Sequence, residues 1–295
     1  MLVKKTVLSL SGRARRKKTA GKVAVYAALT AVAVFLLFPY IFMLNRSLMI
    51  YDDASSIRPV YFFPHSGITF SNFVRIFSEN NYLVYTLNTL KIAAFNIVAV
   101  TLSSSICAYS FARVEWRSKG FVFAAMMATV MIPGSILTIP QYVLFANLGW
   151  TESAKPLMIP TIFGGGALNI FLLTQFMKGV SREMENAAMI DGANLLQRYF
   201  CIVMPLCKPI LIYIAVGTFT GVWSDFTGPL VYLKTQEKYT LAVAIYYDSL
   251  NSSGGTAEPN IRMAVSVFIS AVPAVIFFIY QKNLIEGIQV GAVKG

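Results

Sequence analysis

Long apolar stretches separated by shorter polar segments dominate the pattern along this chain. Six stretches contain a run able to cross the roughly 30 Å of hydrocarbon in a bilayer, for which a helix needs about 20 residues. They cover residues 23–44, 86–112, 120–146, 156–177, 209–233 and 263–280. Because lipid offers no partners to unpaired backbone groups, each stretch is expected to be helical. The pattern predicts an all-α polytopic membrane protein with six transmembrane helices.

The polar segments divide the chain into one membrane domain and two short tails. Residues 1–22 form a basic tail, residues 23–281 the six-helix domain and residues 282–295 a C-terminal tail. The largest segment between predicted spans, residues 45–85, is rich in aromatic residues and is expected to carry a short surface helix at about 72–78. No internal repeat or flexible linker indicates a second domain.

Several predicted spans contain residues that interrupt helices. They are Pro133-Gly134 and Pro140 in the third span, Pro160 and glycines 164–166 in the fourth, Gly228-Pro229 in the fifth and Pro273 in the sixth. Such residues permit kinks and close helix approach in membrane proteins. They favour a scaffold that changes shape, although many membrane proteins of other classes contain them too.

Composition and charge support a membrane protein with both ends in the cytoplasm. Hydrophobic residues make up 56% of the chain and charged residues 13%, which does not fit a soluble globular protein. With the N-terminus placed in the cytoplasm, 17 Lys and Arg residues lie on that side and 7 on the other. This asymmetry follows the positive-inside rule. The net charge of +12 is therefore expected to reflect topology and contact with anionic lipid at the basic tail, not nucleic-acid binding.

The polar segment 181–209, between the fourth and fifth spans, carries the most informative pattern. Its residues Glu183–Ile190 are good helix formers with one apolar face, and Asp191-Gly192 ends that run because Gly tolerates positive φ. A second periodic run, residues 193–204, is expected to end at Pro205. Two short helices that meet at a Gly would form either a compact knob for a partner protein or an amphipathic connector resting on lipid.

The order of residues in this segment resembles the EAA loop of permease subunits in ATP-binding-cassette importers. The matching residues are Ala187-Ala188, Asp191-Gly192-Ala193, Tyr199, Ile202, Pro205 and Pro209. The sequence departs from the family pattern at Asn186, where the family has the Glu that names the motif. Tyr199 replaces Phe, and Met204 replaces Leu. Glu185 is a candidate to supply the charge that Asn186 lacks.

The resemblance implies a type I importer permease fold and a set of partners. These are a homologous second permease, a dimer of ATP-binding-cassette ATPases and an extracytoplasmic solute-binding protein. The residues that would couple to the ATPase are Glu185, Asn186, Ala187, Ala188, Asp191, Gly192, Ala193 and Pro205. The loop at residues 246–260, centred on Gly254-Gly255, matches a loop that approaches the binding protein in relatives, and an ordinary surface turn is the alternative. The C-terminal tail, which ends in Lys294-Gly295, is a further candidate for contact with the ATPases.

Segments beyond the loop narrow the resemblance to carbohydrate importers of the maltose type, and to the smaller of their two permease subunits. They include Met131-Ile132-Pro133, Leu148-Gly149-Trp150 and Tyr239-Thr240-Leu241. The implied localisation is the inner, or cytoplasmic, membrane, with the chain crossing it several times. A permease for an amino acid or a peptide is the alternative, because the loop motif is shared more widely than these segments.

One carboxylate, Asp225, lies well inside a predicted span, where a charge should face protein or water. Together with Trp223 it could contact a sugar, because a ring stacks on CH faces and a carboxylate accepts from hydroxyls. Asn169 is a further polar candidate for the substrate pathway. The structural alternative for all three is hydrogen bonding between helices.

Signals for catalysis are missing from the sequence. It contains no G-x-x-x-x-G-K-[ST] phosphate loop, G-x-S-x-G elbow or H-E-x-x-H motif, and His65 is the single histidine. We therefore expect no catalytic residues, cofactor or metal, and expect ATP hydrolysis in a separate subunit. An ion-driven carrier working alone, or a membrane enzyme or receptor scaffold, are competing functions of other classes.

Overall fold

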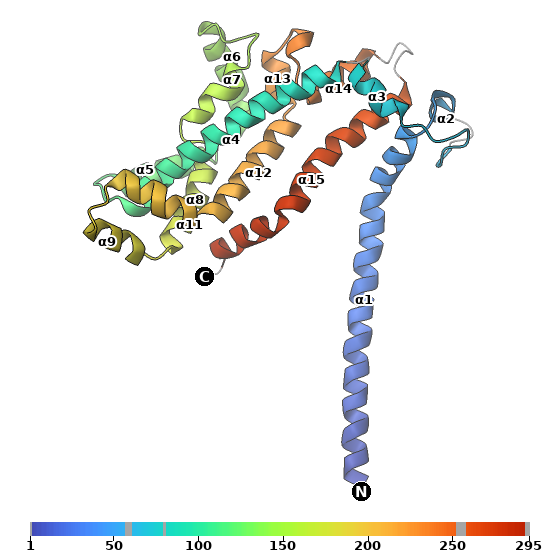
Figure 1. Cartoon of the computed structure of the whole chain (residues 1–295), viewed down its shortest axis with the longest axis horizontal. Coiled ribbons are helices and arrows are strands. Elements are labelled where there is room, and N and C mark those ends of the chain that lie inside the picture. Colours follow the sequence, from blue (N-terminus) through green and yellow to red (C-terminus); the bar gives the residue numbers. More distant parts are fainter. Residues whose placement is uncertain (1, 57–60, 79–80, 252–257, 293–295) are drawn as a thin grey trace. The chain divides into compact units, whose positions relative to one another are not determined.

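The computed structural model describes residues 2–56, 61–78, 81–251 and 258–292, and about 80% of the chain is helical (Figure 1). No strand occurs within these ranges. The chain divides into two compact units, one of residues 1–74 and 258–267 and the other of residues 75–257 and 268–295. The predicted all-α class is confirmed for the described residues.

The first unit contains the long helix α1, Leu2–Ser47, followed by α2, Tyr51–Ser55, and the start of α3, Ser71–Ser78. The surface helix predicted at 72–78 is confirmed by α3. Asn72 fixes its start, because the side-chain amide donates to the carbonyls of Ser47 and Met49 at 2.8 and 2.9 Å. The Asp53 carboxylate accepts from the backbone N–H of Ser66 at 2.7 Å, and this bond lowers the pKa of Asp53.

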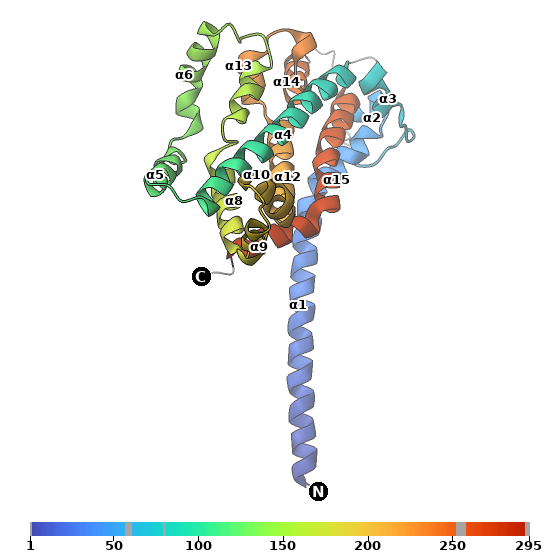
Figure 2. The same cartoon turned by 60° about the vertical axis from the view of Figure 1, so that its left-hand side comes forward.

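The second unit is built around α4, Tyr82–Arg113, which packs against α8, Ala167–Gly179, and α12, Lys208–Ser224 (Figures 1 and 2). The buried core between them includes Tyr109, Leu173, Met177, Val203 and Ile214. Gly165 lies so close to α4 that a Cβ there would be 2.6 Å from the carbonyl oxygen of Val100. The predicted close helix approach at the glycine run therefore occurs at this residue.

The remaining elements connect and extend this core. They are α5 Lys119–Thr129, α6 Gly134–Asn147, α7 Lys155–Met158, the 3-10 turn η1 Ile159–Ile162, α9 Glu183–Ile190, α10 Leu195–Arg198, the π turn η2 Tyr199–Val203, α11 Met204–Leu206, α13 Thr227–Tyr232, the 3-10 turn η3 Gln236–Lys238, α14 Leu241–Asn251 and α15 Pro259–Ala292. In the second unit, α9 lies near one end of α4, and α13 and α14 lie near the other (Figures 1 and 2).

Four helical segments among the described residues are long and apolar enough to cross a membrane. They are Gly21–Ser47, Tyr82–Arg113, Lys155–Gly179 and Pro259–Asn283, and they correspond to the first, second, fourth and sixth predicted spans. Two bent pairs would raise the number to six if each pair is a single span. The structure thus supports four to six spans.

The third and fifth predicted spans are not continuous helices, and the fourth is interrupted between η1, which ends at Ile162, and α8, which begins at Ala167. In the third, α5 ends at Thr129 and α6 begins at Gly134 with a bend of 97°, because Pro133 cannot donate a backbone hydrogen bond. In the fifth, α12 ends at Ser224 and α13 starts at Thr227. By contrast, Pro273 lies inside α15 without ending it. The predicted loop centre Gly254-Gly255 and the terminal Lys294-Gly295 lie outside the described residues.

Candidate functional site

The first half of segment 183–209 forms as the sequence predicts. Helix α9 runs Glu183–Ile190, and Gly192 follows it with φ of +87°. The N–H of Ala193 donates to the carbonyl of Ala188 at 2.8 Å, which is the long closing bond of a Schellman motif. A left-handed residue is required at this point of the motif, so the backbone itself favours Gly at position 192.

The second half differs from the single helix predicted over residues 193–204. A capping box between Asn194 and Gln197 starts α10 only at Leu195, and a π turn follows at Tyr199–Val203. Pro205 does not end the helix. It lies inside α11, and the helical stretch that begins at Leu195 continues to Leu206. The break comes at Cys207, where the direction changes by 78° into α12.

A buried ion pair holds α9 against α4. The Nε of Arg113 lies 2.8 Å from Oε2 of Glu185, and both side chains are at least nine-tenths buried. Tyr109 donates its hydroxyl to the other oxygen of Glu185 at 2.9 Å, and Arg113 also donates to the carbonyl of Val180 at 2.8 Å. Both carboxylate oxygens therefore have a polar partner, which offsets the cost of burying the charge. Segment 183–206 is thereby tied to the end of α4.

Tyr199 makes a second link to α4. Its hydroxyl lies 2.6 Å from the hydroxyl of Ser105, and its ring packs against Tyr109 with centroids 5.2 Å apart. Tyr199 is 3% exposed. The position at which the sequence departs from the family Phe is therefore a buried packing residue whose extra hydroxyl has a partner on α4.

The outer face of the segment combines polar residues with exposed apolar ones. Asn186, Ala187, Asp191 and Gly192 are exposed, and Ala188 and Ala193 are half-buried. This face also exposes five large apolar side chains, and all but Leu195 are exposed by more than half. They are Met184, Met189, Ile190, Leu195 and Leu196. We call residues 184–196 the knob. A mixed surface of this kind, on a rigid base, is suited to contact with another protein.

The three residues predicted for the substrate pathway each have local partners. Trp223 is 3% exposed and donates its indole N–H to the carbonyl of Ile269 at 3.0 Å. Asp225 caps the end of α12 and accepts from the N–H of Gly228 at 3.1 Å. Asn169 donates to the carbonyl of Gly165 at 2.8 Å. These bonds lead to different neighbours, so they do not gather the three side chains into one site.

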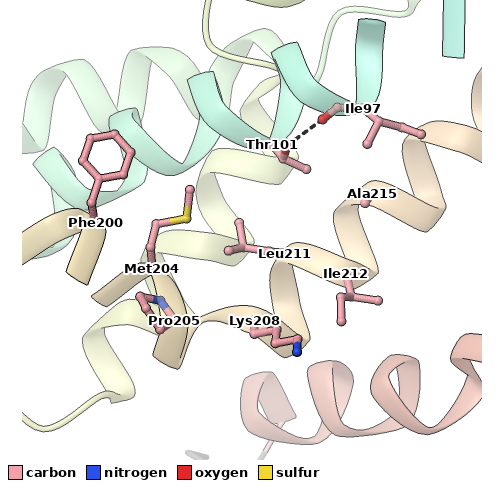
Figure 3. A pocket seen from close by; sticks show the side chains of 9 residues that line it. All are labelled: Ile97, Thr101, Phe200, Met204, Pro205, Lys208, Leu211, Ile212 and Ala215. Carbon is pink, nitrogen blue, oxygen red and sulfur yellow. Dashed lines mark hydrogen bonds between the residues drawn. The ribbon is translucent and has the colours of Figure 1, made fainter. Parts of the chain in front are cut away.

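Sequence reasoning missed a groove between α4 and the bend before α12. It has a volume of about 500 Å³ and is open to its surroundings (Figure 3). Its lining is Ile97, Thr101, Phe200, Met204, Pro205, Lys208, Leu211, Ile212 and Ala215. The hollow lies beside the break at Cys207, two residues after the predicted end of the run at Pro205. Lys208 is the one charged residue of this lining, and the remainder is apolar apart from Thr101, which makes the groove poorly suited to hydroxyl-rich ligands.

Apolar helices long enough to span a membrane, together with a polar helix–turn–helix anchored at the end of α4, are consistent with a membrane transport subunit. The chain belongs to the family of binding-protein-dependent transport system inner membrane components, whose model matches residues 100–290. The resemblance inferred from segment 183–209 is thereby confirmed.

Relatives with assigned substrates match nearly the whole chain. A melibiose/raffinose/stachyose import permease protein of Bacillus subtilis strain 168 is 30% identical over 285 residues, which are 96% of this chain and 100% of the relative. A galactooligosaccharides transport system permease protein of the same organism is 28% identical over 273 residues, with 92% and 94% covered.

A solved structure has the same fold. It is a bacterial ABC transporter involved in the import of the acidic polysaccharide alginate, and it matches with a TM-score of 0.76 at 23% identity. The match covers 90% of this chain and 97% of the other. At this identity the likeness shows the fold alone.

Proposed function

We propose that the chain is a permease subunit of an ATP-driven importer of sugars or oligosaccharides, and that it forms half of the translocation pathway. The observation that carries the proposal is the knob, an exposed helix–turn–helix that the buried ion pair of Glu185 and Arg113 anchors to α4. The sugar class is supported by the relatives, because the 30%-identical one is named for melibiose, raffinose and stachyose import.

The partners follow from this role. A homologous permease would complete the pathway, a dimer of ATPase subunits would bind the knob, and an extracytoplasmic solute-binding protein would deliver the sugar. A solved alginate ABC transporter in complex with an alginate pentasaccharide-bound periplasmic protein, matched at a TM-score of 0.59, supports the last of these. The chain would sit in the cytoplasmic membrane with both termini in the cytoplasm.

The knob would transmit motion along two routes. When ATP closes the ATPase dimer, a pull on α9 reaches α4 through Glu185 and Arg113, which are 2.8 Å apart. The same pull reaches α12 through the helical run that bends at Cys207. Rigid links of this kind turn a local displacement into rocking of whole helices and alternating access.

The small residues of the knob would permit close docking. Ala187 is exposed, while Ala188 and Ala193 are half-buried, so none adds a bulky side chain to the contact. Asn186 is exposed and would offer an amide to the ATPase where the family has a carboxylate. Glu185 is turned inward to Arg113, and its carboxylate is used within the chain instead of replacing the missing charge.

The test is Gly192→Asp in the importer assembled with its partners. Gly192 has φ of +87° and open space around it, so Asp places strain and a charge at the centre of the proposed contact. We expect raffinose uptake, and its coupling to ATP hydrolysis, to fall by more than about tenfold, a loss of ~1.4 kcal/mol or more in the coupled step. Normal amounts of inserted chain should remain.

The matched control is Gly149→Asp. Gly149 also has positive φ, +66°, and open space, but it lies in the turn after α6. The variant likewise places an Asp side chain at a residue with positive φ, and uptake should persist. Uptake by Gly192→Asp equal to that of Gly149→Asp would remove the knob from the coupling mechanism.

A further inference from the structure

A cluster of tyrosines and polar side chains surrounds two hollows at the end of the second unit that holds α14. One hollow has a volume of about 130 Å³ and is lined by Tyr85, Gln236, Tyr239, Ala244, Tyr247 and Asp248. The other has a volume of about 410 Å³ and is lined by Asn81, Val84, Tyr85, Thr235, Gln236 and Glu237. Tyr85 and Gln236 line both, so the hollows adjoin. We call them together the tyrosine pocket.

The walls of the tyrosine pocket are held by backbone contacts. Asn88 of α4 donates to the carbonyls of Glu237 and Tyr239 at 2.8 and 3.1 Å, and Thr89 accepts from the N–H of Leu241 at 2.9 Å. These bonds fix η3 and the start of α14 against α4. The pocket is therefore built before any ligand arrives, which reduces the entropic cost of binding.

The lining of the pocket combines flat rings with polar groups. Tyr239 and Tyr247 stack with centroids 4.9 Å apart and planes inclined by 9°. Gln236 donates to the Tyr85 hydroxyl at 3.0 Å, and Tyr82 donates to the carboxylate of Asp248. Gln236 and Glu237 are exposed at the rim. The Tyr85 hydroxyl oxygen retains a lone pair, and the Gln236 amide retains a second N–H, that a ligand hydroxyl could use.

We propose that the tyrosine pocket is a subsite for neutral sugar units, distinct from the predicted pathway residues Trp223, Asp225 and Asn169. Tyrosine rings pack against the CH faces of a sugar, and carboxylate, amide and phenol groups exchange hydrogen bonds with its hydroxyls. A volume of about 410 Å³ falls within the usual range of small-molecule sites, roughly 300–1,000 Å³. This inference rests on the proposed function, since it assigns a place to the sugar of that importer.

The charges of the lining select neutral sugars over acidic ones. Glu237 and Asp248 are among the lining residues. The lining residues that the structure describes for the two hollows include no Lys or Arg. The nearby Lys238 donates its ammonium group to the carbonyl of Glu152 at 2.7 Å. A uronate carboxylate in this pocket would lie near the carboxylate of Glu237, and this like-charge contact disfavours binding.

The experiment is saturation-transfer NMR on the full chain in nanodiscs of zwitterionic lipid, with raffinose as the probe and trigalacturonate as the acidic comparison. We expect transfer from the protein to the ring protons of raffinose and little to trigalacturonate. Gln236→Leu, at an exposed position, and Tyr239→Leu should each weaken raffinose binding by about fivefold, the effect of one lost hydrogen bond or ring contact.

The matched controls are Gln281→Leu and Tyr280→Leu on α15, which change the same residue types outside the pocket. Both should bind raffinose as the unmodified chain does. Raffinose binding that is equal in the pocket and control variants overturns the subsite, as does equal binding of trigalacturonate.

Uptake by the importer assembled with its partners separates this result from a failure of the proposed function. Raffinose or maltotriose uptake that is insensitive to Gln236→Leu and Tyr239→Leu would reject the pocket and leave the sugar importer standing. Uptake of amino acids or peptides with no uptake of either sugar would reject both.

Discussion

At the scale of single residues, Glu185 matters most to the proposed coupling. The sequence placed it in the segment that resembles the EAA loop but could not show that its carboxylate turns inward. Arg113 stands 72 positions earlier in the chain, at the end of a different helix, and no local pattern relates the two. Only the packing of α9 on α4 brings their atoms to 2.8 Å.

The first prediction concerns this ion pair. Arg113→Met leaves a buried carboxylate unpaired, and Glu185→Gln leaves a buried guanidinium unpaired. Each single variant should therefore destabilise the chain by about 3–5 kcal/mol. The double variant removes both charges and should cost clearly less than the sum of the two. Thermal unfolding of the purified chain in detergent measures all three.

The control for this prediction is Glu115→Gln. Glu115 pairs with Lys119 at 3.1 Å, but its side chain is 78% exposed, so loss of that pair should change the unfolding temperature little. Additive effects of Glu185→Gln and Arg113→Met would show that the two side chains do not interact in solution.

At the scale of elements, the sequence predicted α9 to its exact bounds and missed the shape of the next stretch. Glu183–Ile190 is bounded by a Gly that the Schellman motif requires, which is a local signal. No local sequence signal predicts the π turn at Tyr199–Val203. The turn places Tyr199 and Val203 in the core of the second unit, at 3% and 0% exposure, where Tyr199 contacts Ser105 and Tyr109 of α4.

The second prediction concerns the contact of Gly165, just before α8, with α4. Gly165→Ala would place a Cβ 2.6 Å from the carbonyl oxygen of Val100, on a residue with φ of +63°. We expect a loss of about 1–3 kcal/mol in stability, because the crowded atoms are backbone and cannot turn aside. Thermal unfolding of the purified chain again provides the measurement.

Gly217→Ala is the matched comparison. Gly217 lies inside α12, and an added Cβ would meet nothing within 4 Å, so Ala should stabilise the helix by about 0.5–1 kcal/mol. Opposite signs for the two substitutions support the close approach at Gly165. An equally harmless Gly165→Ala would show that this segment and α4 lie further apart.

At the scale of the whole molecule, the hydrophobic pattern located the apolar segments long enough to span a membrane, but it did not predict where their helices are interrupted. Four predicted spans correspond to helical segments long enough to cross a membrane, while the third is bent by 97°. Pro133-Gly134 marked that position in advance, yet whether such a pair produces a gentle kink or a sharp turn depends on neighbouring helices. Likewise, Gly228-Pro229 alone did not predict that α12 would end at Ser224.

The third prediction concerns orientation. Cys201 is exposed on the segment that carries the knob, so it should face the cytoplasm. A membrane-impermeant maleimide added to intact cells should not label Cys201, and should label it once the membrane is permeabilised. In a Cys201→Ser background, Ser252→Cys, in the sequence between α14 and α15, should be labelled in intact cells. The reverse pattern would place the knob outside and away from any cytoplasmic ATPase.

The most direct test of the central claim compares raffinose uptake by proteoliposomes that contain this chain alone with uptake by the chain assembled with its second permease and ATPase subunits. The assembled importer, supplied with binding protein and ATP, should accumulate raffinose, and the chain alone should not. Uptake at equal rates without ATPase subunits would contradict the proposed mechanism, since the knob at residues 184–196 would then have nothing to transmit.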